Sequence, residues 1–450
     1  MTVKSITVLI PTLNSIEFMQ ECLESVINQT LEALEIIVID AGSTDGTLEL
    51  IESYQKKDGR IRIIHSEKKS YGYQLNMGIT MARGDYIGIV ESDDVVELDM
   101  YETLLEVAIE KDADFVKSNF AHYAVTEDKQ EMIIPETIIS KSIIGKVINP
   151  IEYKNIYLED FYLWRGIYKR EFLIKNKIVF HESTGAAYQD IGFLYQTFTL
   201  AKRVVYLENC FYKYRRNNSN SSTYSPKAFS YLAGEYTYIL EKLKKSRTMN
   251  QEWDSLFYQK MFIQCRSRFR LLAFHGGDFK DVKSDILCLQ RILKDAYIQQ
   301  KINLSLWSMQ SQIEFFMMTE DISAYMEYYR VQMVAKRQCV NNMIVGLKSF
   351  SEIILVGDSK AAPFIYTLLK GNYINTIVNI CDNDRNKWGE ARMGLKIISV
   401  EQATEVKENS AFLISSVKAK KELIQQLISL GIRERQIFIY DLGTDWLLLP

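Results

Sequence analysis

The sequence is poor in cysteine and histidine, and it contains no long apolar run. Its six cysteines are scattered over 450 residues without a CxxC pair, and its four histidines lack metal-ligand spacing. These absences exclude a dense disulfide framework and indicate the reduced thiols of a cytoplasmic protein. No stretch approaches the roughly 20 apolar residues that a membrane-spanning helix needs, so any membrane contact is expected to be peripheral.

An excess of charge of one sign is also missing. The 54 basic and 57 acidic residues leave a formal net charge of −3. A general nucleic-acid binder needs a dominant basic field, so nucleic acid is not an expected partner. The first residues, Met1–Ser5, run into a predicted strand and lack the apolar core and cleavage site of a signal peptide. A cytoplasmic location is therefore expected.

Length and changes in composition predict three parts. In residues 1–225, short buried strands alternate with helices, which predicts parallel βαβ units. In residues 226–349, glycine and proline almost vanish and aromatic residues recur at helical spacing, which predicts a helical region interrupted near Gly276 and Gly277. Residues 350–450 return to alternating strands and helices and predict a small Rossmann-like domain.

Carboxylates gather where predicted strands of the first part end. The apolar run Tyr86–Val90 stops at Glu91-Ser92-Asp93-Asp94, which places three carboxylates within four residues. Clustered carboxylates repel one another, and the usual partner for such hard oxygens is Mg²⁺ or Mn²⁺. Asp40 follows another strand, and parallel strands end at one edge of a sheet, so these acids can face one crevice. The alternatives are a solvated loop and, for Asp40, a carboxylate that caps the next helix.

Six segments together resemble the family 2 glycosyltransferases of the GT-A fold. In chain order they are Ile10–Asn14, Ile37–Thr47, Asn76–Ile79, Ala82–Ile87, Glu91–Asp94 and Tyr188–Phe193. Each segment is weak evidence alone, but their order and spacing are specific, and the resemblance covers residues 5–225. It implies an α/β nucleotide-diphospho-sugar transferase fold, here followed by the helical region and the Rossmann-like domain.

The resemblance also implies an activity and its cofactor. A metal-dependent inverting glycosyltransferase would move a sugar from a nucleotide sugar, expected to be a UDP-sugar, to a hydroxyl of a surface glycan, lipid-linked intermediate, polymer or protein. Mn²⁺ or Mg²⁺ held by Asp94, with Asp93 beside it, would bridge the donor diphosphate. Asp190 would deprotonate the acceptor hydroxyl in a single displacement. The alternative for Asp190 is an N-cap of the following helix.

Other positions take donor and acceptor roles from the same resemblance. The donor-side residues that it implies are Pro11, Thr12, Asn14, Asp40, Gly72, Asn76, Ser92, Asp93 and Arg215. Trp164, in a segment that mixes aromatic and basic residues, and Gln189 are assigned to the acceptor. Two departures stand out, because Gln189 replaces a usual glutamate and Leu75 replaces an arginine of many relatives.

Two other classes of protein compete with the transferase. A nucleotidyltransferase would carry a glycine-rich basic loop after the first strand, where this chain has Pro11–Asn14. A non-catalytic scaffold would use a degenerate transferase domain to present the C-terminal unit to partners, but the key aspartates are intact. In that unit Gly357 alone remains of a GxGxxG pattern, which favours a structural or partner-binding role over dinucleotide binding. A homo-oligomer stays open.

Overall fold

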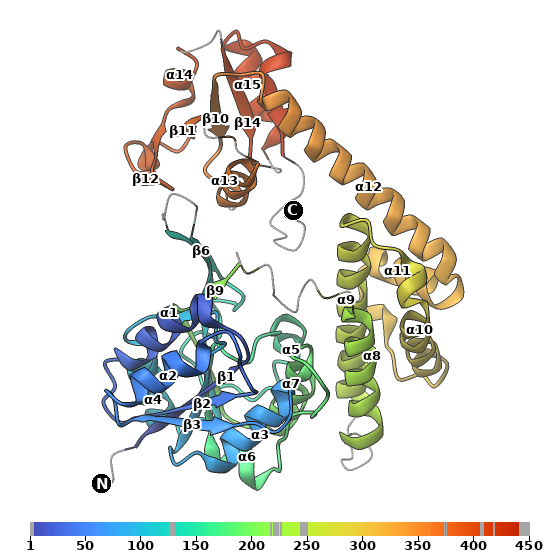
Figure 1. The fold of residues 1–450 in the computed structure, drawn as a ribbon. Helices are drawn as coiled ribbons and strands as arrows, with labels where there is room; N and C mark the ends of the chain where they lie inside the picture. The colour runs from blue at the N-terminus through green and yellow to red at the C-terminus, as the bar shows by residue number, and fades with distance from the viewer. Residues whose placement is uncertain are drawn as a thin grey trace. The chain divides into compact units, whose positions relative to one another are not determined.

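The structure is a computed structural model, and its contacts divide the chain into two compact units. It describes residues 4–125, 131–216, 218, 225, 227–243, 251–359, 361–372, 374, 376–405, 409–416 and 419–440. The first unit contains residues 1–125, 133–265 and 282–320, and the second contains residues 126–132, 266–281 and 321–450 (Figure 1). The three-part division expected from composition stays a prediction.

Four parallel strands begin the first unit. They are β1 (Ile6–Thr12), β2 (Leu34–Asp40), β3 (Ile61–His65) and β4 (Tyr86–Ile89), in the spatial order β3-β2-β1-β4. The connecting helices are α1 (Ile16–Ile27), α2 (Thr47–Gln55) and α3 (Tyr71–Met81). The parallel strands and their connecting helices confirm the predicted βαβ units. Strands that are covered by helices on both faces are continuous β-branched runs in the sequence.

The sheet continues with strands of mixed direction, to nine strands among the described residues. They are β5 (Val95–Val96), β6 (Phe115–Val125), β7 (Glu131–Glu136), β8 (Gly166–Lys169) and β9 (Val204–Arg215), with helices α4 (Met100–Glu110), α5 (Asn155–Glu159), α6 (Arg170–Lys175) and α7 (Gln189–Leu200). Strand β8 runs antiparallel to β4 and β6, and β9 runs antiparallel to β5. This pairing lays the end of β9 beside the acidic segment that follows β4.

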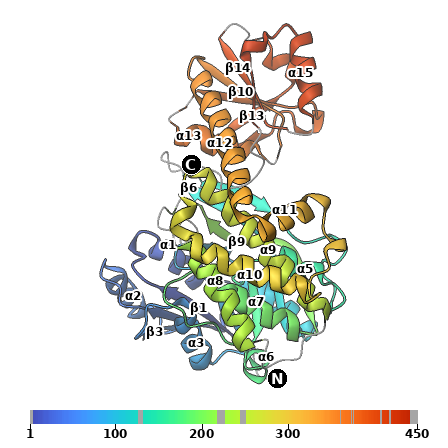
Figure 2. The same ribbon diagram turned by 90° about the vertical axis from the view of Figure 1, so that its right-hand side faces the viewer.

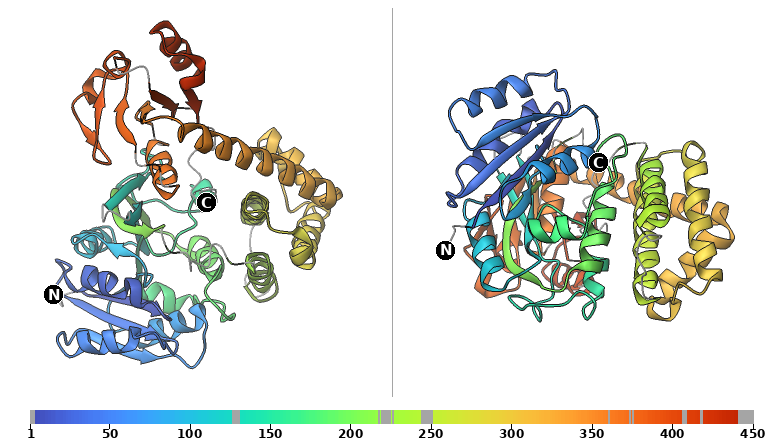
Figure 3. Two further views of the ribbon diagram at one scale, coloured as in Figure 1. Left: turned by 45° about the horizontal axis from the view of Figure 1, so that its top comes forward. Right: turned by 90° about the horizontal axis from the view of Figure 1, so that it is seen from below.

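The predicted helical region is confirmed, and its first helices belong to the first unit. They are α8 (Ala228–Tyr238), continued by a π-helical turn (Ile239–Leu243), then α10 (Lys283–Ile298) and α11 (Met309–Glu320), while α9 (Gln251–Phe274) belongs to the first unit up to residue 265 and to the second unit from residue 266. Helix α9 ends just before Gly276, whose φ of 75° suits glycine. In Figures 2 and 3, α8 lies beside α7.

The second unit contains the long helix α12 (Ile322–Leu347) and a six-stranded sheet. The strands are β10 (Glu352–Val356), β11 (Ile377–Cys381), β12 (Ala391–Arg392), β13 (Leu395–Ile398), β14 (Ser410–Ile414) and β15 (Ile437–Ile439), with helices α13 (Ala362–Gly371), α14 (Val400–Ala403) and α15 (Lys420–Ser429). Short 3₁₀ turns lie at Phe279–Val282, Leu304–Leu306, Arg385–Lys387 and Glu434–Gln436. The order β13-β11-β10-β14-β15, parallel throughout, is that of a Rossmann-like unit, as predicted.

In the part of the chain that the structure describes, no helix combines the length and the apolar character required to cross a membrane.

Candidate active site

The ends of β1 and β4 are joined by a chain of hydroxyl groups. Thr12 Oγ1 donates to Ser15 Oγ at 3.2 Å, and Ser15 Oγ lies 2.7 Å from Ser92 Oγ. Thr12 also faces Asp40 across the β1–β2 pair. Residues that are distant in the sequence therefore meet at one edge of the sheet. Pro11, beside Thr12, is buried within β1.

Asp40 is occupied by the turn that follows it. Only 1% of the residue is exposed, and its Oδ2 accepts the backbone N–H groups of Gly42 and Ser43 at 2.9 and 3.1 Å. Asn14 supports the same turn, because its Oδ1 accepts the N–H of Thr44 at 2.8 Å. Helix α2 has Gly46 as its N-cap, so Asp40 stabilises the turn and is not the cap of the helix.

Gly72 and Asn76 contact another segment of the protein. A Cβ atom at Gly72 would lie 2.0 Å from the carbonyl oxygen of His181, so no other residue fits without a shift of the backbone. The Asn76 amide donates to the Phe180 carbonyl at 3.0 Å and accepts the Phe180 N–H at 2.9 Å. Both residues thus fix α3 to the segment that precedes α7, which gives each of them a packing role.

Glu91, the first acid after β4, is half-buried beside two tyrosines. The Tyr71 hydroxyl donates to Glu91 Oε1 at 2.5 Å, and the Glu91 N–H donates to the Tyr212 hydroxyl at 3.0 Å. Burial raises the pKa of Glu91 to about 8, against the hydrogen bond from Tyr71 and with help from the charges of Asp93 and Asp190. Glu91 is therefore a carboxyl group whose protonation changes near neutral pH.

Asp94 lies at the bottom of the acidic segment, with 0% of the residue exposed. Its Oδ2 accepts from the Tyr212 hydroxyl and its Oδ1 from the Arg215 N–H, both at 2.7 Å. Burial, followed by the charge of Asp93, raises the pKa of Asp94 well above its usual range. Both oxygens accept a hydrogen bond from β9, so Asp94 anchors that strand in this geometry.

Arg215 completes this anchor and is itself buried. Its Nε donates to the Asp93 carbonyl at 2.6 Å, and its guanidinium forms an ion pair with Glu21. The same guanidinium lies over the Tyr123 ring at 4.8 Å. Arg215 therefore shapes the backbone of the acidic segment. The serines at 219, 221 and 222, which follow it, lie outside the described residues.

Asp93 is the aspartate of the pair that remains half-exposed. Its Oδ2 accepts from the Asn218 amide at 2.7 Å. Among the described residues, no group of three or more His, Cys, Asp or Glu could hold a metal ion. Mg²⁺ at phosphate sites often takes only one or two carboxylates and fills its shell with water and phosphate oxygens. Asp93 fits that mode of binding, and a metal cage made of protein alone does not.

Asp190 lies in the first turn of α7 and is half-buried. The N-cap of that helix is Tyr188, with a φ of 69°, so the alternative of Asp190 as the N-cap is wrong. Burial and then the charge of Glu235 raise the pKa of Asp190 to about 6, whereas Lys260 lowers it. Asp190 also raises the pKa of Glu91, so the two carboxylates act on each other although 99 positions separate their numbers.

Gln189 and Trp164 lie below the surface of this crevice. The Gln189 amide donates to Ser183 Oγ at 2.9 Å and to the Gly185 carbonyl at 3.1 Å, and the residue is buried. Trp164 is 6% exposed and stacks on Tyr212 with ring centroids 4.0 Å apart. In this geometry both residues support the side chains and loops around the crevice.

A buried ionic cluster lies next to β6 and β8. It contains Arg165, which directly precedes β8 and belongs to the mixed aromatic and basic segment. Asp160 Oδ2 accepts from Lys117 Nζ at 2.8 Å and forms an ion pair with Arg165 Nη2 at 3.0 Å, and Arg165 Nε donates to Asp160 Oδ1 at 3.4 Å. Burial raises the pKa of Asp160, but the two cations outweigh this and bring it to about 2. Lys260 of α9 donates to the Asp160 carbonyl at 2.6 Å. Arg165 is thus enclosed in the protein and does not face a phosphate.

Four residues of the site have no counterpart among the residues assigned from the sequence. They are Tyr71, Tyr212, Glu235 and Lys260. Tyr212 stands three positions before Arg215, within a segment of alternating aromatic and basic residues. The other three lie in helices with ordinary amphipathic patterns. Only the packing of the folded chain brings these polar side chains close to the acidic residues of the site.

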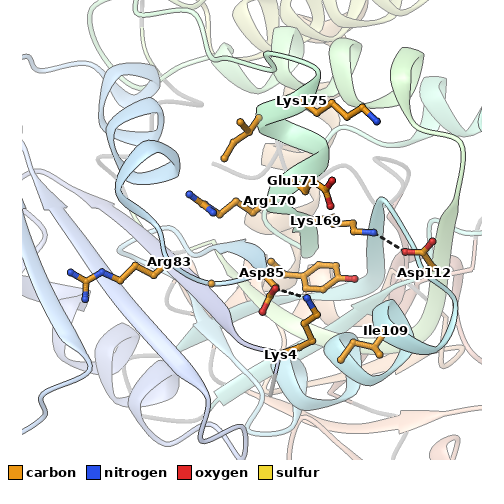
Figure 4. A pocket seen from close by; sticks show the side chains of 12 residues that line it. Lys4, Arg83, Asp85, Ile109, Asp112, Lys169, Arg170, Glu171 and Lys175 are labelled. Carbon is orange, nitrogen blue, oxygen red and sulfur yellow. Dashed lines mark hydrogen bonds and ion pairs between the residues drawn. The ribbon is translucent and has the colours of Figure 1, made fainter. Parts of the chain in front are cut away.

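A separate cavity of about 500 Å³ opens at the opposite ends of β1 and β4 (Figure 4). Lys4 and Asp85 form an ion pair of 2.6 Å at its wall, and Lys169 and Asp112 form one of 2.7 Å. Lys4 and Asp85 precede the two strands, whereas Asp93 follows them. The cavity therefore lies away from the acidic segment. Asp112, the first residue of the DxD sequence at 112–114, is in an exposed turn after α4.

Comparisons with known proteins cover the part of the chain that holds these acids. The family model described as glycosyl transferase family 2 matches residues 7–192, which include Asp40, Asp93, Asp94 and Asp190. Glycosyltransferase GlyG of Streptococcus pneumoniae is 32% identical over 225 residues, or 48% of this chain and 72% of that protein. The uncharacterized glycosyltransferase EpsJ of Bacillus subtilis is 33% identical over 236 residues, or 51% and 67%.

Solved structures agree in fold. The crystal structure of S. aureus TarS 1–349 gives a TM-score of 0.53 at 17% identity, and covers 74% of this chain and 91% of that one. Its complex with UDP-GlcNAc gives 0.55 at 18% identity, with 74% and 92% covered. At this level of identity the likeness concerns the fold.

Proposed function

This chain belongs to glycosyltransferase family 2, and we propose from that premise that it is a metal-dependent, inverting enzyme that uses a UDP-sugar. The observation that carries the proposal is that two kinds of carboxylate, Asp190 and Asp93, are both linked to Glu91. Asp190 is half-buried with a pKa raised to about 6 by burial, the half-exposed Asp93 belongs to the acidic segment after β4, and the charges of both raise the pKa of Glu91. One suits a base and the other a cation beside a diphosphate.

On the donor side, Asp93 is the proposed ligand of Mn²⁺ or Mg²⁺. The cation, when bound, would stabilise the charge that grows on the diphosphate as the glycosidic bond breaks. Asp94 and Arg215 hold the backbone of Asp93 in place through the contacts described above. Asp94 stays the proposed second ligand, because each of its oxygens accepts one hydrogen bond and keeps a lone pair.

On the acceptor side, Asp190 is the proposed general base. It would take the proton of the acceptor hydroxyl while that oxygen bonds to the anomeric carbon and the bond to the leaving diphosphate oxygen breaks. A pKa of about 6 leaves the carboxylate mostly ionised at neutral pH and still basic enough to accept the proton. One displacement of this kind inverts the anomeric centre, and the rate should fall as the pH drops below about 6.

A UDP-sugar is the proposed donor, and TarS, which shares the fold, has been crystallised with UDP-GlcNAc. The proposed acceptor is a hydroxyl on a surface glycan, a lipid-linked intermediate, a polymer or a protein. The cytoplasm is the proposed location, since all six cysteines are free thiols in the structure.

The test is a panel of UDP-, GDP-, CDP- and dTDP-sugars, each with and without Mn²⁺, followed by thermal shift and donor hydrolysis. One UDP-sugar should stabilise the protein and be hydrolysed slowly, and only with metal. Asp190→Asn should keep the thermal shift and lose turnover by roughly a hundredfold or more. Asp112→Asn, in the exposed DxD at residues 112–114, is the matched control and should keep both the thermal shift and the turnover. Near-full turnover by Asp190→Asn would refute the assignment of the base.

A further inference from the structure

Two helices outside the segment that the family model matches bring buried charges to the base. Glu235 of α8 is 2% exposed and Lys260 of α9 is 1% exposed. Glutamate and lysine are almost never buried to this degree unless something compensates their charge. The two side chains have opposite charges, and both act on Asp190.

Glu235 is built into the beginning of α7. Its Oε1 accepts the backbone N–H of Gly192 at 3.1 Å, and its Oε2 pairs with His181 Nδ1 at 2.8 Å. Gly192 follows Asp190 by two positions, and a Cβ there would lie 2.5 Å from Glu235 Oε1. The carboxylate therefore occupies the space that a side chain at position 192 would fill, next to the turn that carries the base.

Lys260 is held by backbone carbonyls at the end of α5. Its Nζ donates to the carbonyl oxygens of Tyr157 and Asp160, both at 2.6 Å, and lies 4.2 Å from the centre of the Tyr157 ring. The carboxyl end of a helix and the face of an aromatic ring both favour a cation. Its ammonium group is thus fixed by uncharged groups, and its charge is left to act on carboxylates that it does not touch.

We propose that Glu235 and Lys260 are positioning residues of the catalytic centre, and that the helical region completes the active site by placing a buried carboxylate against the turn of α7 that carries Asp190 and a buried ammonium group at the end of α5. Glu235 raises the pKa of Asp190 and Lys260 lowers it, while burial lowers the pKa of Lys260 to about 7, so that Lys260 carries its charge in the pH range where Asp190 titrates. The inference deepens the proposed function, on which it rests.

The other groups around Asp190 do not replace these two. Groups that interact electrostatically with it are Tyr71 on α3, Glu91 after β4, Lys117 on β6, Tyr168 on β8, Glu235 and Tyr236 on α8, and Lys260 on α9. Among the charges, Lys117 is paired directly with Asp160, and Glu91 is held by Tyr71. The two largest influences of other side chains on the pKa of Asp190 are Glu235, which raises it, and Lys260, which lowers it.

Buried charges of both signs gather in this region. The buried cations are Lys117, Arg165 and Lys260, and the buried carboxylates are Asp160 and Glu235, with the half-buried Asp190 in the first turn of α7. Burial lowers the pKa of Lys117 to about 8 and that of Lys260 to about 7, so the net charge of the set depends on pH.

The experiment measures the pH dependence of donor turnover in Glu235→Gln, Lys260→Met and the double variant. Removing the negative charge should move the acidic limb to lower pH, and removing the positive charge should move it to higher pH, each by about one pH unit. The double variant should return close to the wild-type limb. Lys294→Met is the matched control, because Lys294 on α10 forms an exposed ion pair with Glu320 and should leave the limb in place.

Structural damage would lower the turnover without moving the acidic limbs of the two single variants in opposite directions. If Lys260→Met does not fold, Lys260→Gln replaces it, since an amide still donates to the two carbonyls, and the same shift is expected. Turnover with unchanged limbs, or with both limbs moved the same way, would overturn this inference and leave the transferase standing. Absence of turnover in the wild-type protein with every donor would instead overturn the proposed function.

Discussion

Replacing Asp160 with asparagine should destabilise the first unit severely, because it removes the carboxylate that neutralises a buried ionic cluster. The Asp160 carboxylate accepts from Lys117 and Arg165 and from the Tyr206 hydroxyl at 3.3 Å. Asparagine keeps the size of the side chain and loses the charge. Two cations then remain buried beside a neutral amide.

The expected loss is about 3–5 kcal/mol in the free energy of unfolding, the usual cost of removing one partner of a buried ion pair. The same change at Asp85, whose pair with Lys4 has side chains 35% and 47% exposed, should cost less than about 1 kcal/mol. The two variants make the same chemical change at a buried and at an exposed site, so their comparison shows how much more the enclosed cluster depends on its carboxylate.

The penalty should also depend on pH, with a sign that follows from Lys117. Burial lowers the pKa of this lysine to about 8, although Asp160 raises it in part. Without Asp160 the folded-state pKa drops further, while the unfolded value stays near about 10.4. The unfolded variant then binds more protons than the folded one, so its stability rises with pH. The difference from the wild type should therefore shrink as the pH is raised from about 6 to about 8.

Urea unfolding followed by circular dichroism measures the loss, and hydrogen exchange of peptides from β6 assigns it to the first unit. A loss for Asp160→Asn no larger than that for Asp85→Asn would refute the view that this cluster depends on its carboxylate. A penalty that grows with pH would refute the role given to Lys117.

Two further predictions concern single positions in the crevice and in the helices around it. Asp93→Asn should abolish the metal-dependent thermal shift with the donor and leave the melting temperature of the ligand-free protein unchanged. Asp94→Asn should abolish the shift and also lower the ligand-free melting temperature, because Asp94 anchors β9. Equal ligand-free melting temperatures of the two variants would contradict the anchoring role of Asp94. Gly72→Ala should cost about 1–3 kcal/mol through its clash with the His181 carbonyl. Gly234→Ala changes a helical glycine with nothing within 4 Å of the added Cβ, and it should stabilise the protein by about 0.5–1 kcal/mol. Urea unfolding of Gly72→Ala and Gly234→Ala measures both changes, and a loss at both positions or at neither would contradict the two packing assignments.

The strands and helices of both units follow closely from local sequence. Runs such as Leu34–Asp40 and Glu352–Val356 are buried on both faces of parallel sheets, so nearly every residue in them is apolar or β-branched. The acids that follow β2 and β4 are equally visible, because a charged residue after a buried run interrupts the pattern. Topology then brings these strand ends to one edge, and this much of the site could be predicted.

The surroundings of the side chains could not be predicted in the same way. Trp164 and Arg165 look like surface residues when a basic segment is considered alone, but their partners Tyr212 and Asp160 come from other elements. Local sequence does not state whether a cation meets a ligand or a carboxylate of the same chain. The same limit applies to Asp94, whose oxygens are engaged by Tyr212 and Arg215, more than 100 positions away.

The contacts of Lys260 with Tyr157 and Asp160 have a consequence for protein engineering. The family model ends at residue 192, and the first part predicted from composition ends at residue 225. A cut at either border would remove Glu235 and Lys260 from the fragment that keeps Asp190. A hybrid joined at either border would combine a base from one parent with charges from the other. Functional exchange therefore needs helices α8 and α9 to travel with the sheet.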